Sequence, residues 1–213
     1  MRIERFELNP FQENCYVVSD ESNEGIIIDC GAFYTEERKA IVKYVKDNNI
    51  RLKHLLATHA HIDHNFGNNT IYEAFNLKPE VYGEDEYMMS KLPQQAMMFC
   101  NYKLDYEMPP VGRFLKADDT IHVGRHTFTV IPTPGHTKGS VFFYCKEQKV
   151  AFSGDTLFKM SIGRTDFEQG SFSDIIDSLK KLKDLIEPDT VILPGHGPKT
   201  TLDYELKYNP YFK

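Results

Sequence analysis

The chain has 213 residues, of which 41% are hydrophobic and 26% charged, and 25 Lys and Arg against 31 Asp and Glu give a net charge of −6. This length and composition fit one folded domain spanning residues 1–213 and exclude a disordered or collagen-like chain. The acidic balance argues against a nucleic-acid or anionic-membrane binder, which would display a basic surface. No run of about 20 apolar residues and no signal peptide is recognised, so the cytoplasm is the expected compartment.

The first part of the chain alternates strand and helix patterns. Strands are predicted at 3–8, 15–20, 24–31 and 52–58, and helices from Thr35 onward, with Thr35 as the N-cap, and at 66–75. This βαβ order predicts a parallel crossover, in which residues at strand ends face one edge of the sheet.

The middle and the second half differ. A methionine-rich stretch near 83–118 predicts a helical insert that Pro93 breaks into two short helices. Strand patterns then return at 120–131 as a hairpin, 141–145, 149–158 and 189–197, with an amphipathic helix at 173–186 and a short C-terminal helix. We therefore predict an α+β fold with two mixed β-sheets and helices packed outside them.

The four cysteines lie in or beside apolar runs and form no CxxC pair: Cys15, Cys30, Cys100 and Cys145. Buried, reduced thiols explain this placement better than disulfides or metal ligands do.

Residues 58–64, THAHIDH, place three imidazoles and a carboxylate directly after an apolar strand. These are the N and O donors that zinc and similar metals prefer. On an extended or tight-turn backbone, His59 and His61, which are two apart, point to the same side, while Asp63 and His64 turn toward the next helix. One loop could thus serve two metals. A solvated His-rich loop is the alternative.

Three further ionisable residues follow apolar strands at turns: His136 in PTPGHTKGS, Asp155 in FSGDTLF and His196 in LPGHGP. Each alone is also explained by turn chemistry, but together they indicate a site at one end of the sheets. We interpret His54, His122 and His126 as ordinary surface or packed side chains. Asp29 is either a turn residue or an acceptor that orients a ligand imidazole, and we favour the second.

HAHIDH, followed in order by His136, Asp155 and His196, resembles the metallo-β-lactamase superfamily over nearly the whole chain. The resemblance implies an αββα sandwich. Within the superfamily, the intact His61 with Asp63 and His64 is similar to the compact, single-domain glyoxalase II-like (hydroxyacylglutathione hydrolase-like) thioesterases. The C-terminal helical domain of full glyoxalase II enzymes has no counterpart here, so glutathione dependence is not implied.

The resemblance also implies site roles. His59, His61 and His136 would hold one metal, Asp63, His64 and His196 the other, and Asp155 would bridge the two. Asp63 and Asp155 are predicted to be the catalytic residues. The metals are expected to be two divalent ions, zinc first, with iron or manganese as alternatives.

Such a pair of metals lowers the pKa of a bridging water toward about 7 and supplies a hydroxide nucleophile. A thiolate leaving group needs no acid, so we predict a zinc-dependent thioester or ester hydrolase acting on a small molecule. The run GRTDF at 163–167 also resembles persulfide dioxygenases, which use one iron, and this is the main alternative. A phosphodiesterase and a non-catalytic metal-binding module are further alternatives.

Two substrate contacts are predicted. Arg164 offers a planar fork suited to a substrate carboxylate, with a structural salt bridge as the alternative. Met97 and Met98, in the insert, are proposed to shape an apolar acyl pocket, with a core or dimer contact as the alternative. No membrane or nucleic-acid partner is expected, and the chain is expected to be a monomer or a homodimer.

Overall fold

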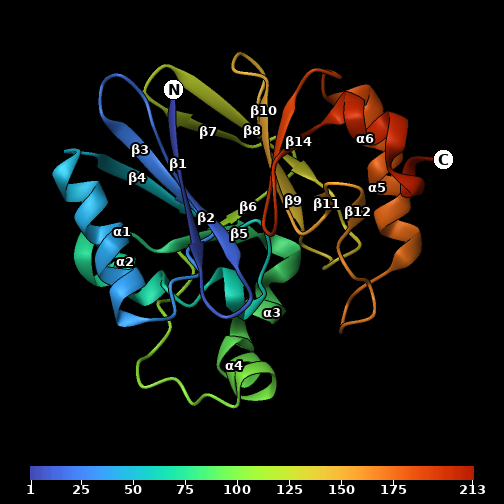
Figure 1. Ribbon diagram of the computed structural model, residues 1–213. Helices are drawn as coiled ribbons and strands as arrows, with labels where there is room; N and C mark the ends of the chain where they lie inside the picture. The colour runs from blue at the N-terminus through green and yellow to red at the C-terminus, as the bar shows by residue number, and fades with distance from the viewer.

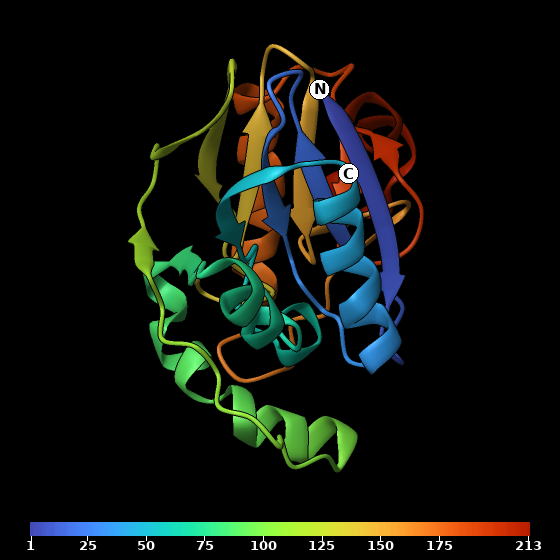
Figure 2. The same cartoon turned by 90° about the vertical axis from the view of Figure 1, so that its left-hand side faces the viewer.

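A computed structural model describes residues 1–213. Two six-stranded sheets lie face to face, and helices cover the outer face of each sheet (Figure 1). Helices α1 (Thr35–Asp47) and α2 (Asn68–Phe75) lie outside the first sheet, and α5 (Phe172–Leu185) and α6 (Leu202–Tyr208) outside the second. Figure 2 shows α1 and α2 in front of the first sheet, with the second sheet behind it. This is the αββα sandwich that the sequence predicts.

The first sheet has strand order β1 to β6, with β1–β3 antiparallel and β3–β6 parallel. Its strands are β1 (Arg2–Leu8), β2 (Glu13–Ser19), β3 (Glu24–Ile28), β4 (Arg51–Leu56), β5 (Pro79–Tyr82) and β6 (Arg113–Leu115). The crossovers carry α1 and α2, so β3, β4 and β5 all end at the same edge. The loop after β4 therefore lies at that edge, as the βαβ pattern predicts.

The second sheet has strand order β14-β13-β10-β9-β8-β7. Its strands are β7 (Thr120–Val123), β8 (His126–Pro132), β9 (Val141–Cys145), β10 (Val150–Gly154), β13 (Val191–Pro194) and β14 (Thr200–Thr201). β10 and β13 are parallel and joined through α5, while the other pairs are antiparallel. A small hairpin of β11 (Leu157–Phe158) and β12 (Ser161–Ile162) follows β10. Both sheets are mixed, as predicted.

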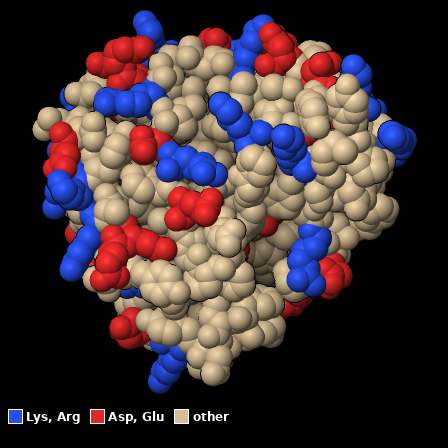
Figure 3. Space-filling view, in the orientation of Figure 1, with Lys and Arg blue, Asp and Glu red and all other residues tan.

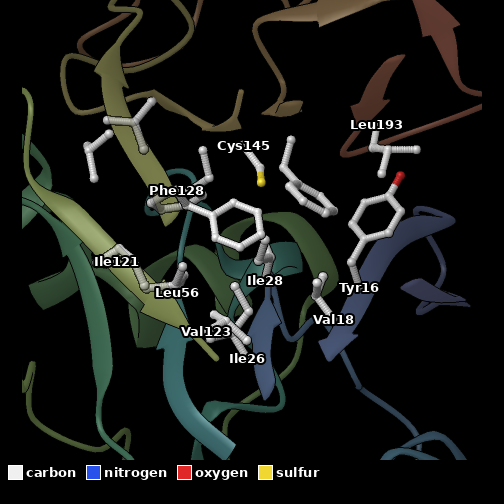
Figure 4. Packing of buried hydrophobic residues seen from close by; sticks show 14 of the residues in the cluster. Tyr16, Val18, Ile26, Ile28, Leu56, Ile121, Val123, Phe128, Cys145 and Leu193 are labelled. Carbon is white, nitrogen blue, oxygen red and sulfur yellow. The ribbon is translucent and has the colours of Figure 1, made fainter. Parts of the chain in front are cut away.

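The main core lies between the two sheets. Figure 4 shows side chains of β2 and β3 pointing toward those of β8 and β9, and Phe128, Phe152 and Ile28 are fully buried there. The rings of Tyr16 and Phe152 pack edge to face at 5.1 Å, and the Tyr16 hydroxyl donates to the Pro194 carbonyl at 2.8 Å. Each fully buried large side chain contributes about 1.5–3 kcal/mol. The core therefore fixes the relative position of the strand ends on which the site is built.

The outer helices agree with the sequence patterns to within a few residues. Ile175, Leu179 and Leu182 form the buried stripe of α5 against the second sheet, and the Ser171 hydroxyl caps the helix by accepting from the Asp174 amide. Helix α1 begins at Thr35, but its N-cap is Tyr34, because the Glu37 carboxylate accepts the Tyr34 amide and takes over the capping.

The methionine-rich insert is helical over only part of the predicted range. A 3₁₀ turn, η2 (Gly83–Asp85), leads into α3 (Glu86–Ser90) and α4 (Leu92–Cys100). Pro93 lies in the first turn of α4, where proline is tolerated, so it begins the second helix rather than breaking one. Asn101 ends α4 in the left-handed conformation (φ 49°), and Pro109 and Pro110 follow. The chain then enters β6 at the edge of the first sheet, a strand that the sequence pattern did not predict.

All four cysteines are free, and Cys15, Cys30 and Cys145 are buried, as the apolar runs around them indicate. Cys100, the last residue of α4, is only partly buried, contrary to the sequence interpretation. None of the helices combines the length and the apolar character that crossing a membrane would require.

Candidate metal centre

The predicted ligands come from four loops at one end of the sandwich. His59 lies in a bend after β4, His61 follows in extended backbone, and Asp63 and His64 lie in the short 3₁₀ turn η1 (Ile62–His64). The other three follow strands of the second sheet, with His136 after β8, Asp155 after β10 and His196 after β13. Both sheets thus contribute to one site.

The first group consists of His59, His61 and His136, whose ligand atoms all lie within 4.8 Å of one another. His61 Nδ1 and His136 Nε2 are 2.8 Å apart, and the three rings stand edge to face. Three nitrogens converging on one point are suited to a divalent metal.

The second group consists of Asp63, His64 and His196, whose ligand atoms also lie within 4.8 Å of one another. His196 Nε2 is 3.3 Å from Asp63 Oδ2, and His64 Nε2 is 3.7 Å from the same oxygen. Two nitrogens and a carboxylate oxygen form a second set of donors that suits zinc or iron.

Asp155 lies between the two groups. One carboxylate oxygen, Oδ1, is 3.4 Å from His64 Nε2, while Oδ2 is 3.5 Å from His196 Nε2 and 3.6 Å from His136 Nε2. A single carboxylate therefore faces nitrogens of both groups, which is the position of a group shared by two metals.

Several donor atoms of this cluster are buried and have no hydrogen-bond partner, namely His59 Nε2, His64 Nε2 and Asp155 Oδ1. A buried polar atom left unsatisfied costs about 1–3 kcal/mol, and native proteins seldom tolerate several together. Metal ions would satisfy all three atoms at once. The residues present therefore fit the binding of divalent metals.

Three histidines of the cluster contact oxygen atoms of the protein through Nδ1, the ring nitrogen that points away from the other donors. His64 Nδ1 contacts the Asp29 carboxylate at 3.1 Å, His136 Nδ1 contacts the Arg164 carbonyl at 2.7 Å, and His196 Nδ1 contacts the Phe11 carbonyl at 3.0 Å. A carboxylate or carbonyl at Nδ1 keeps the proton there and leaves Nε2 free as a donor. The rings are thus oriented for binding before any metal arrives.

Asp29 makes more contacts than the one to His64. Its Oδ1 accepts the Thr58 amide and its Oδ2 accepts the Thr58 hydroxyl, both at 2.7 Å. The residue adopts a left-handed backbone (φ 55°), a conformation that Asp and Asn tolerate better than most side chains. The structure therefore places Asp29 against the imidazole of His64, one of the predicted ligands.

Burial and mutual charge set the protonation of the cluster. Burial raises the pKa of Asp155, but His64 and His196 outweigh it and hold the pKa well below its usual range. Burial, with His136 next in effect, lowers the pKa of His61 to about 3, and burial also lowers the pKa of His59. For His64 and His196, burial acts in the same direction, but the carboxylates of Asp155 and Asp63 outweigh it and raise the pKa of both residues. Because metals bind ionised carboxylates and neutral imidazoles, Asp155, His59 and His61 already have the binding form, whereas His64 and His196 must release a proton on binding.

Two buried carboxyl groups near the cluster were not predicted. Asp85 accepts the amides of Ala60 and Gly139, each at 2.8 Å, and so ties the loop of the first group's histidines to the loop of His136. Glu13 lies 4.0 Å from His64 Nδ1 with both carboxylate oxygens unpartnered, and burial raises its pKa well above the usual range. No sequence signal marks either, because Asp85 lies in an acidic run typical of solvent exposure and Glu13 in a strand buried on both faces.

A pocket of about 390 Å³ opens onto the cluster. Its lining residues from the cluster are His61, Asp63, His136, Asp155 and His196. The other lining residues are Phe11, Ile62, Phe99, Phe158, Arg164 and Phe167. Figure 3 shows a recess below the centre of this face, rimmed mostly by uncharged residues. Apart from the cluster itself, the residues that line the pocket are thus mostly aromatic.

Of the residues predicted to contact substrate, Arg164 lines the pocket and the two methionines do not. Arg164 lines the pocket, but its guanidinium is paired with Asp166. Met97 and Met98 do not line it; Met97 lines a separate pocket of about 700 Å³, and Met98 is 75% exposed. Phe99 lines the site instead, since successive helical residues point about 100° apart.

The three histidines interpreted as ordinary stay outside the cluster. His54 contacts Glu80 at 2.5 Å, and His122 and His126 flank the turn between β7 and β8. None belongs to a group of converging donors.

Comparison with known proteins agrees with the geometry. The family model for the metallo-beta-lactamase superfamily matches residues 8–196. Hydroxyacylglutathione hydrolase GloC of Haemophilus influenzae is 32% identical over 99% of this chain and 98% of its own length. Among solved structures, the BLEG-1 B3 metallo-beta-lactamase has a TM-score of 0.90 at 28% identity and covers both chains completely. TTHA1623, solved in a di-iron-bound form, has a TM-score of 0.85 at 32% identity over 98% of this chain and 99% of its own. The chain belongs to the metallo-beta-lactamase superfamily.

Proposed function

We propose that this chain is a thioester hydrolase that works with two divalent metal ions, zinc in preference to iron or manganese. The observation that carries the proposal is the convergence of two donor groups on Asp155, with buried donor atoms in both groups left unpartnered. A site for one metal would need only one of the two groups. The similarity to GloC, a hydroxyacylglutathione hydrolase, supports the thioester class.

His59, His61 and His136 would hold one ion, and Asp63, His64 and His196 would hold the other, with Asp155 shared. Ions held there supply Lewis acidity, which brings the pKa of water toward neutrality and polarises an ester or thioester carbonyl.

The chain's own residues prepare this chemistry. Asp63 and Asp155 are the catalytic carboxylates, since both reach the pocket and their neighbouring histidines lower the pKa of each below the usual range despite burial. Asp29 acts as a positioning residue by holding His64. The phenylalanines that line the pocket reduce the water around a bound substrate and so strengthen its electrostatic contacts.

The residues that line the pocket indicate which kind of leaving group the site can release. Apart from the two donor groups, the lining residues are four phenylalanines, Ile62 and Arg164, none of which readily donates a proton near neutral pH. A thiolate, from a thiol with a pKa near about 8.5, departs without an acid, whereas an amine leaves only after protonation. The pocket therefore suits thioesters better than amides or lactams.

A mononuclear iron persulfide dioxygenase is the second candidate. It is favoured by the run at 163–167, in which the Arg164 carbonyl contacts His136 Nδ1 and so links the run to the first group. The complete second group argues for the hydrolase, because a one-metal enzyme has no use for it.

The test is a substrate panel on chelator-treated protein reloaded with zinc or with iron(II). We expect zinc-loaded protein to hydrolyse aryl and alkyl thioesters faster than matched esters and far faster than a β-lactam. His196→Gln should abolish this turnover, while His122→Gln, on the distant hairpin, should leave it unchanged. Faster β-lactam cleavage, or oxygen consumption with a persulfide on iron(II) and no thioester turnover, would overturn the proposal.

A further inference from the structure

The apolar wall of the pocket, beside the cluster, is built from phenylalanines of four separate segments. Phe11 comes from the β1–β2 turn, Phe99 from α4, Phe158 from β11, and Phe167 from the loop before α5. Phe167 joins the wall to the cluster, since its ring lies 5.2 Å from that of Phe99 and 5.6 Å from that of His61. The wall offers a substrate broad apolar contact.

The only cationic side chain that lines this pocket is Arg164, and it is already occupied. Arg164 Nε lies 2.7 Å from Asp166 Oδ1, and its terminal nitrogen lies 2.7 Å from Oδ2, a bidentate pair. The guanidinium also stacks on Phe167, with its carbon 3.8 Å from the ring centroid. Asp166 thus fills the Nε–Nη2 edge of the planar fork, one of the edges that a substrate carboxylate would use, and balances the charge of the guanidinium.

The loop that carries this pair is fixed on two sides. On the inner side, the Arg164 carbonyl contacts His136 Nδ1 at 2.7 Å. On the outer side, the Tyr87 hydroxyl donates to Glu168 Oε1 at 3.1 Å, which ties the loop to α3. The ion pair is therefore held at the pocket mouth by its surroundings, and Arg164 lowers the pKa of Asp166 to about 2, so the carboxylate stays charged at neutral pH.

We propose that Asp166 sets the substrate selectivity of this pocket by occupying the guanidinium of Arg164. The pocket then prefers thioesters whose remote groups are uncharged and apolar over thioesters that carry a remote carboxylate. This inference rests on the proposed function for its substrate class, the thioesters. The affinities of the pocket for charged and uncharged ligands can nevertheless be measured without turnover.

The preference arises because Asp166 already pairs with Arg164, so a substrate carboxylate gains little binding free energy from the guanidinium. A remote carboxylate that enters the pocket loses hydration and meets a guanidinium whose charge Asp166 already balances. It can reach only the Nη1 side of Arg164, or it must displace Asp166 and replace one ion pair with another. An uncharged group loses little hydration and gains contact with the phenylalanines. Removing the charge of Asp166 would free the fork and reverse this balance.

The experiment measures binding of two non-hydrolysable probes, (phenylthio)hexanoic acid and its carboxamide, to the zinc-loaded protein by calorimetry. Wild type should bind the carboxamide more tightly. Asp166→Asn keeps the size of the side chain and one acceptor oxygen, and should raise the ratio of carboxylate to carboxamide affinity about fivefold, the upper range for an exposed ion pair.

Two further variants decide the cause. Adding Arg164→Gln to Asp166→Asn should cancel the rise, because no free guanidinium remains. Asp177→Asn removes a similar exposed acid, paired with Lys180 at 3.0 Å on α5, and should leave the ratio at the wild-type value. Tighter carboxylate binding by wild type, or a ratio in Asp166→Asn within about twofold of wild type, would overturn the inference.

The outcome is separable from that of the proposed function. Probe binding reports the selectivity even for a protein that turns over no thioester, whereas the substrate panel reports the reaction even when Asp166→Asn leaves the ratio unchanged.

Discussion

Replacing Asp29 by Asn tests the idea that His64 is positioned for a metal by its outer nitrogen. Asn has nearly the same shape and tolerates the left-handed backbone of this position (φ 55°). Its amide oxygen can still accept the Thr58 amide. Its NH₂ group, however, would face His64 Nδ1, where the carboxylate oxygen lies 3.1 Å away in the native chain.

Two donors facing each other are unfavourable, so the proton of His64 would move to Nε2, the atom that points into the cluster. A ligand that must first shed or move this proton binds metal more weakly. Loss of such a supporting contact typically costs about 10–100-fold in metal affinity, equivalent to about 1.4–2.7 kcal/mol. We expect this loss mainly for the ion held by Asp63, His64 and His196.

The assay is a competition titration of metal-free protein against a chromogenic zinc chelator. Glu205→Gln is the matched control, since Glu205 is also fully buried and accepts three hydrogen bonds, from Thr200, Met160 and Asn209. Both variants should lose stability, by about 1–3 kcal/mol each. Only Asp29→Asn should weaken zinc binding. Unchanged zinc affinity in Asp29→Asn, or an equal loss in Glu205→Gln, would show that Asp29 does not position His64 for a metal.

Asp155→Ala should weaken both metals, because Asp155 faces both groups; retention of both after dialysis against a mild chelator would contradict this. His54→Gln should leave metal content and turnover near wild type, and a large loss of either would place the boundary of the cluster elsewhere. The pKa of His61 is about 3 in the folded chain, against an ordinary value of 6.5. As the pH falls, the imidazole of His61 therefore binds a proton in the unfolded chain before it does so in the folded chain. The melting temperature of the metal-free wild type should therefore drop more than that of His61→Asn between pH 6.5 and about 4, and parallel curves would contradict the burial of a neutral His61. Phe99→Ser should change the acyl chain-length preference while Met98→Ser should not; the reverse result would support the sequence prediction about the methionines over the observed pocket lining.

The fold could be predicted from the sequence where periodicity and burial coincide. The stripe of Ile175, Leu179 and Leu182 marks α5 because a helix on a sheet buries one face. The strand β6 escaped prediction because it has three residues, Arg113–Leu115, two of them exposed, and its pairing with β5 is set by distant contacts.

The candidate site divides in the same way. His59, His61 and Asp155 could be found because donors at strand ends are unusual outside sites, and the strands bring them together. Phe99 could not be distinguished from Met97 and Met98 by sequence, because all three are apolar neighbours on one helix and only its docking decides which side chain faces the pocket.

Asp85 and Glu13 were hidden for a different reason. Their importance arises from burial beside the loops of the cluster, and nothing in the residues next to them indicates it. Contacts between segments far apart in the chain, such as that of the Asp85 carboxylate with the Gly139 amide, appear only in three dimensions.

Titration of metal-free protein with zinc, with thioester hydrolysis followed at each step, shows whether two metals cooperate in the reaction. We expect the initial rate to rise until about two equivalents of zinc are bound per chain and then to stay constant. Saturation at about one equivalent, or absence of thioester hydrolysis at full zinc loading, would rule out a thioester hydrolase with two cooperating metals.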